Sequence, residues 1–64
     1  MLLKKYRELS GMTQAELAAS IGVTQQAIAN YENQHRAPSV RMCLVIIKAL
    51  KKSGVDVTIE ELFR

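Results

Sequence analysis

Residues 13–33, TQAELAASIGVTQQAIANYEN, decide the fold of this chain because they contain two helix starts separated by a glycine. Thr13 is an N-cap whose hydroxyl can accept hydrogen bonds from the free N–H groups of the next turn. Glu16 follows three residues later and completes a capping box. Thr24 begins a second helix by the same chemistry. Gly22 lies between them and permits a positive φ, so the stretch predicts helix, short turn, helix.

The two predicted helices, roughly residues 14–20 and 25–32, differ on their two sides. Apolar side chains at helical spacing are expected to face one core: Leu17, Ile21, Val23, Ile28 and Tyr31. The outward side of the second helix carries amide and methyl side chains without charge. An amide can bond bidentately to adenine in the major groove, so such a face suits base reading.

This stretch resembles the helix-turn-helix of the lambda-repressor-like (XRE-type) DNA-binding domains, which include phage repressors and Cro proteins. The resemblance covers roughly residues 3–50. The matching residues are Gln14, Leu17, Ala18, Gly22, Val23, Ile28, Glu32, Asn33 and Pro38, with Arg7 upstream. It implies an all-α fold, a compact bundle of five short helices in a single domain over residues 1–64, with helices 2 and 3 forming the helix-turn-helix.

The same resemblance implies a sequence-specific transcriptional regulator that binds double-stranded DNA at a palindromic operator and acts as a repressor. The single cysteine fits the reducing cytoplasm as its location. We expect a small Cro-like phage protein or the N-terminal domain of a longer repressor. Gln25 and Gln26 would read base edges, and Asn30, one turn further on, is a third candidate. Ala27 and Ala29 can contact thymine methyl groups or allow close approach of the DNA. For the glutamines, the alternative is a plain polar helix surface.

Contacts to the DNA backbone would position the protein rather than specify sequence. Gln14 begins a helix, where backbone N–H groups favour anions, and the resemblance implies a phosphate contact for a glutamine there. The other candidates for the backbone are Thr24, Ala27, His35, Arg36 and Lys4. For Lys4 and His35 the alternative is an ordinary solvated surface residue.

In the family, an arginine on the first helix pairs with a glutamate at the end of the recognition helix. Arg7 and Glu32 match these positions, so we expect a structural ion pair, with a solvated arginine as the alternative. The family usually has glycine after the Glu-Asn pair, whereas this chain has Gln34. We therefore expect Asn33 to adopt the left-handed conformation, which asparagine tolerates well.

The predicted fourth helix, residues 40–52 after an N-cap at Ser39, is more apolar than a single buried stripe requires. Its expected core positions are Val40, Cys43, Leu44, Ile47 and Leu50. A small domain cannot bury a helix on all sides, so either a fifth helix after Thr58 or a second copy of the chain covers the excess. The candidates for a homodimer contact are Met42, Val45, Ile46, Val55, Val57 and Phe63. The connection over residues 51–57 is longer than in the family, which leaves the dimer geometry open.

Composition bounds these interpretations. The 64 residues make one small domain, and 48% hydrophobic with 23% charged residues argues against disorder. The net charge of +3 permits nucleic-acid binding without requiring it. The single cysteine, Cys43, excludes an internal disulfide, and no apolar run approaches the roughly 18 residues of a membrane span.

Other functions find less support in the residues. We expect no metal and no cofactor, because His35 and Cys43 have no second ligand at a suitable spacing. No phosphate-binding glycine loop or Ser/His/Asp set is present, so we expect neither an enzyme nor a small-molecule substrate. The alternative is a helical protein-interaction module, or an antitoxin-type regulator that binds a partner protein.

Overall fold

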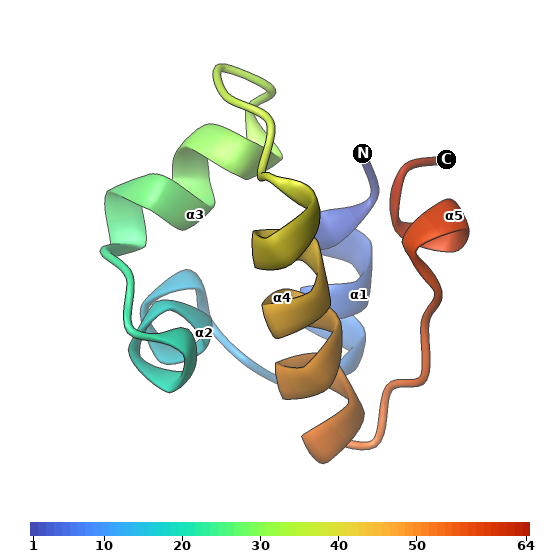
Figure 1. Cartoon of the computed structure of the whole chain (residues 1–64). Coiled ribbons are helices and arrows are strands. Elements are labelled where there is room, and N and C mark those ends of the chain that lie inside the picture. The colour runs from blue at the N-terminus through green and yellow to red at the C-terminus, as the bar shows by residue number, and fades with distance from the viewer.

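Five α-helices and no β-strand make up the computed structural model, which describes residues 1–64 and confirms the predicted all-α class. The helices are α1 (Leu3–Leu9), α2 (Gln14–Ile21), α3 (Gln25–Glu32), α4 (Val40–Lys52) and α5 (Ile59–Leu62). Figure 1 shows α2 and α3 on one side of α4, with α1 behind it and α5 on the other side. The longest helix, α4, has 13 residues, so none is long and apolar enough to cross a membrane.

Side-chain caps fix where four of the five helices begin. Thr13, Thr24, Ser39 and Thr58 each accept a hydrogen bond from the backbone N–H three residues later. Glu16 and Glu61, at the third position of their helices, complete capping boxes with Thr13 and Thr58. The predicted N-caps are therefore confirmed, and the start of α3 is set by local chemistry rather than by packing.

The turn between α2 and α3 depends on one glycine. Gly22 caps α2 in the left-handed conformation, with φ 75°, and its N–H donates to the carbonyl of Ala18. Only one further residue, Val23, separates this glycine from the cap of α3 at Thr24. The tight turn brings α3 across α2 (Figure 1), which is the predicted helix-turn-helix.

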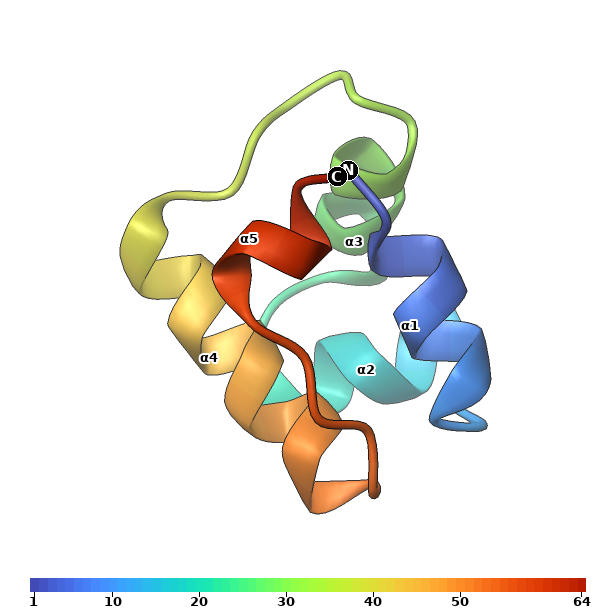
Figure 2. The same cartoon turned by 90° about the vertical axis from the view of Figure 1, so that its right-hand side faces the viewer.

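Every helix contributes to one hydrophobic core. Its fully or nearly fully buried members are Leu3, Leu17, Ala18, Ile28, Ile46, Leu50, Val57 and Leu62. The N-terminus is also tied to α5, because the N–H of Leu2 donates to the carbonyl of Leu62 at 2.7 Å. Figure 2 accordingly shows the two ends of the chain side by side. The short α5 therefore closes the core.

The buried stripe of α4 differs from the predicted one. Ile46, expected at a dimer contact, is completely buried, whereas Leu44, expected in the core, is 54% exposed. Val40 is also exposed, and Val57, the second misplaced dimer candidate, is buried. The reason is packing: α4 lies between α2 and α5, and the side that it turns toward the core carries Cys43, Ile46 and Leu50.

The prediction that Asn33 adopts the left-handed conformation in the loop after α3 is wrong. Asn33 keeps a right-handed conformation with φ −84°, and Gln34 instead adopts φ 63°. Asn33 is the C-cap of α3 and keeps helical dihedral angles, and its N–H donates to the carbonyl of Ala29, so the reversal falls one residue later. His35 and Arg36 then donate their N–H groups back to the carbonyl of Asn30. A long side chain thus occupies a backbone position that favours glycine.

Replacing Gln34 with glycine should stabilise the protein. Relief of the left-handed strain outweighs the greater freedom of the unfolded chain, for a gain of about 0.5–1 kcal/mol. Thermal unfolding should show a midpoint raised by about 4 °C. Asn33→Gly is the matched control and should lower the midpoint, because its φ is right-handed. The reverse order of the two variants would contradict the assignment of strain to Gln34.

Candidate nucleic-acid interface

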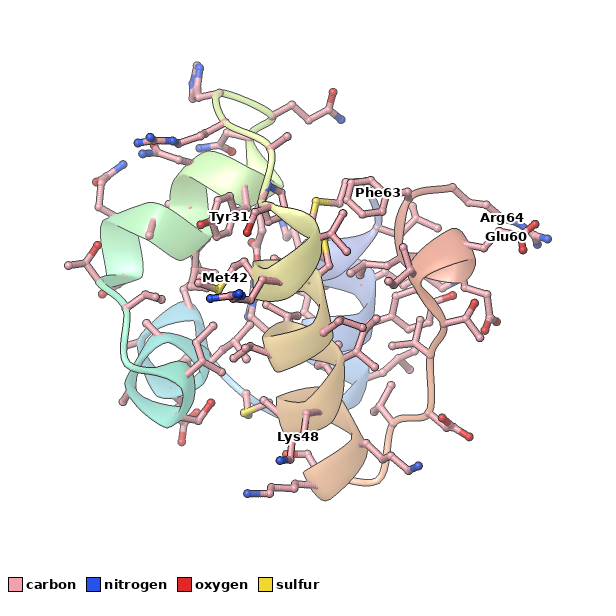
Figure 3. The ribbon with its side chains drawn as sticks, in the orientation of Figure 1. Tyr31, Met42, Lys48, Glu60, Phe63 and Arg64 are labelled. Atoms are coloured by element: carbon pink, nitrogen blue, oxygen red, sulfur yellow. The ribbon has the colours of Figure 1, made fainter.

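One side of α3 is anchored in the core and the other is open to solvent. Ile28 is completely buried, and Tyr31 is half-buried against the core. Figure 3 places Tyr31 between α3 and α4. Gln25 and Gln26 are exposed near the start of the helix. The two predicted base-reading glutamines are therefore accessible, and no other part of the chain covers them.

Gln26 and Asn30 form a hydrogen-bonded pair that the sequence analysis missed. The Gln26 Nε2 donates to the Asn30 Oδ1 at 3.0 Å, across one turn of α3. The bond fixes the orientation of the Gln26 amide, leaving its Oε1 and its second N–H unused. One acceptor beside one donor matches the N6 and N7 edge of adenine. The signal in the sequence was the spacing of two amides four residues apart.

A buried carboxylate joins α3 to the two helices before it. Arg7 donates through Nε to the Glu32 Oε2 at 2.6 Å and through Nη2 to Oε1 at 3.2 Å. Gln14, at the start of α2, donates its Nε2 to the same Oε1 at 3.0 Å. Arg7 also donates Nη1 to the carbonyl of Met12. The ion pair implied by the resemblance is present, and Gln14 is an unpredicted third member.

The electrostatics of this cluster favour its charged form. Burial alone raises the pKa of Glu32, but the hydrogen bonds from Arg7 and Gln14, with the charges of Arg7 and Lys4, outweigh burial and lower it. The hydrogen bond to Glu32 raises the pKa of Arg7, against a smaller opposing effect of burial. The carboxylate is therefore ionised at neutral pH, and it holds the last turn of α3 against α1 and α2.

The candidates for backbone contacts are spread over α1, α2, α3 and the loop after α3. Thr24 is exposed at the start of α3, although its hydroxyl oxygen already accepts from the N–H of Ala27. His35 and Arg36 are exposed just beyond the end of α3, whereas Lys4 lies on α1, near enough to Glu32 to lower its pKa. The remaining two candidates are less free: Ala27 is half-buried, and one N–H of the Gln14 amide is committed to Glu32.

The candidates for a dimer contact are divided by burial. Phe63 is 44% exposed and Val45 is 37% exposed, while Met42 and Val55 are half-buried against the core. Figure 3 shows Phe63 near the two ends of the chain and Met42 between α3 and α4. Because Ile46 and Val57 lie inside the monomer, only the other four residues of the predicted set are accessible to a second copy.

Two short helices that cross at a tight, glycine-containing turn form a helix-turn-helix, and α2 and α3 have this arrangement. Residues 3–62 match the helix-turn-helix family, and the chain belongs to this family. It is similar to an uncharacterized HTH-type transcriptional regulator of Methanothermobacter thermautotrophicus, with 34% identity over 55 residues. That alignment covers 86% of this chain and 80% of the relative. No solved structure matches the chain.

Replacing Glu32 with glutamine should destabilise the protein at pH 7 by about 3 kcal/mol, because the buried Arg7 charge loses its partner. The pKa of Glu32 is lowered in the folded state, so its contribution is complete above the unfolded pKa of about 4.3. That contribution disappears as pH falls through the lower folded pKa. In denaturant unfolding, the free energy of unfolding should therefore fall less between neutral and acidic pH for Glu32→Gln than for the wild type. The exposed Glu60→Gln is the control and should unfold like the wild type.

Proposed function

We propose that this protein is a DNA-binding transcriptional regulator, acting as a repressor, whose α3 reads operator half-sites in the major groove. Membership of the helix-turn-helix family and similarity to an HTH-type transcriptional regulator support DNA binding and regulation. One structural observation carries the proposal: Gln25 and Gln26 are exposed on α3, and Gln26 and Asn30 lie on the side of the helix opposite the buried Ile28.

In this proposal α3 lies in the major groove and α2 crosses the phosphate backbone above it. The Gln26–Asn30 pair acts as one reading unit with a preference for adenine, since the bond between them fixes the amide orientation. Gln25 is unpaired and reads the neighbouring base pair. The outer face of α3 carries no charge that would repel any base, so its selectivity among base pairs depends on hydrogen-bond geometry.

Contacts to the phosphates come from both ends of α3 and from α2. Thr24 and the first N–H groups of α2 approach one stretch of backbone, because unpaired N–H groups at a helix start attract anions. Arg36 and His35, beyond the end of α3, approach another. Because these contacts are few, one copy binds weakly, and a homodimer on a palindromic operator would supply the remaining affinity. The partner is double-stranded DNA in the cytoplasm, with no cofactor and no catalysis.

A second function is favoured by the exposed apolar residues of α4. Val40 and Leu44 are exposed, and neither has a role in the core or at the face of α3. They support the alternative of a helical protein-interaction module, or of an antitoxin-type regulator that binds both DNA and a protein. Duplex binding measured at several salt concentrations tests the pure interaction module, because such a module would not bind the duplex, whereas phosphate contacts make DNA affinity fall steeply with salt.

Base readers and backbone contacts should respond differently to mutation. After selection of a preferred duplex from a random pool, Gln25→Ala should cost about 1–3 kcal/mol on that duplex and relax the preference at one base pair. Arg36→Ala should weaken binding to all duplexes alike and reduce the slope of affinity against salt by about one. Binding isotherms on the preferred and single-substitution duplexes measure both effects. Equal loss of specificity in the two variants contradicts the assigned roles.

The proposed dimer should depend on Phe63. Sedimentation at micromolar concentration, with and without a palindromic duplex, should show two copies per duplex for the wild type. Phe63→Ser should reduce the amount of that complex, because Phe63 is the largest exposed apolar side chain near the C-terminus. Leu9→Ser, at an exposed leucine on α1, is the matched control. A stable complex of one copy on half-site DNA would count against dimerisation.

A further inference from the structure

The outer side of α4 combines apolar and basic residues with no acid. Val40 is 71% exposed, Leu44 54% and Val45 37%. The four exposed cations of the same helix are Arg41, Lys48, Lys51 and Lys52. At 100° per residue these seven side chains occupy one side of the helix, here named the basic-apolar face. Figure 3 shows Lys48 projecting from this helix.

Stabilisation of the helix explains only two of the four cations of α4. Lys51 and Lys52 lie in the last turn of α4, where cations complement the helix dipole. Arg41 lies in the first turn, where a cation is unfavourable, and Lys48 lies in the middle of the helix. Neither takes part in an ion pair within the protein. Two cations therefore flank exposed aliphatic side chains without serving the fold.

A groove continues this face toward the helix-turn-helix. It has a volume of about 300 Å³ and runs between α2 and α4. Its apolar lining comes from Met12, Ile21, Val45 and Ala49, and Lys48 and Lys52 stand at its edge. No carboxylate lines the groove. An occupant would thus find apolar contact along its centre and positive charge along one border.

We propose that the basic-apolar face and its groove form a docking site for an amphipathic helix of a partner protein that carries acidic residues beside its apolar stripe. The positive charge of the face is complementary to an acidic occupant. Its apolar side chains are complementary to an apolar stripe on that occupant. The length of α4, about 20 Å for 13 residues, suits a helix rather than a small ligand.

Other occupants fit the same observations less well. A second copy presenting its own α4 would bring four cations against four, which is repulsive. The acidic α5 of a second copy has only four residues, of which Leu62 is buried and Glu61 caps its own helix. Nucleic acid would satisfy the cations but would leave Val40, Leu44 and Val45 against phosphates.

The probe is a synthetic helical peptide of about 15 residues, with leucines at every third or fourth position and glutamates beside them. It should bind at micromolar concentration and shift the amide NMR signals of Ile21, Val45 and Ala49. Arg41→Glu with Lys48→Glu should weaken binding about tenfold or more, and so should Leu44→Gln. The matched controls are Lys5→Glu and Leu9→Gln, on the exposed side of α1, and they should leave peptide binding unchanged.

Four results would overturn the proposal. They are absence of binding, equal binding of a scrambled peptide of the same composition, a footprint away from α4, and stronger shifts of the Val45 and Ala49 signals by duplex DNA or phosphatidylserine vesicles. Thermal unfolding of each variant reports whether it keeps its fold. Leu44→Gln should keep wild-type affinity for duplex DNA, so a failure of the docking site is distinguishable from a failure of DNA binding.

Discussion

The buried carboxylate of Glu32 is the constraint on which the rest of the molecule depends. A carboxylate removed from water is costly unless charged and hydrogen-bonding partners replace the solvent. Arg7 of α1 and Gln14 of α2 together supply three donated hydrogen bonds to it. Because the net effect lowers its pKa, these partners more than compensate for burial. The end of α3 is therefore fixed by directional bonds as well as by apolar packing.

This constraint gives the face of α3 its rigidity. The start of the helix is set by the cap at Thr24 and the turn at Gly22, and its end is set by Glu32. Ile28, midway between them, is buried in the core. With both ends and the inner side held, the outer amides need no further support from the fold. The backbone that carries the outer amides is therefore held in position, and the hydrogen bond between Gln26 and Asn30 orients one of these amides.

The two sides of α4 show how a helix with apolar residues on more than one side is used in a small domain. One side, centred on Ile46 and Leu50, closes the core between α2 and α5. The other side keeps aliphatic groups in solvent but surrounds them with cations. Like charge disfavours contact between two such faces, so self-association through α4 is opposed while contact with an acidic partner is favoured. One side of α4 thus stabilises the fold, and the charge of its other side selects which surfaces can bind there.

The sequence by itself determined where four of the five helices begin, because a threonine or serine cap and a glycine turn act through bonds within a few residues. It also identified Gln25 and Gln26 as outward-facing, since the apolar period of α3 leaves them no place in the core. The tertiary structure alone decided which stripe of α4 is buried, because that helix offers two apolar sides and only the neighbouring helices choose between them. It also decided that Gln14 joins Arg7 at Glu32 and that Gln34, rather than Asn33, adopts the left-handed conformation. Those features depend on where separate helices meet and end, which no local pattern encodes.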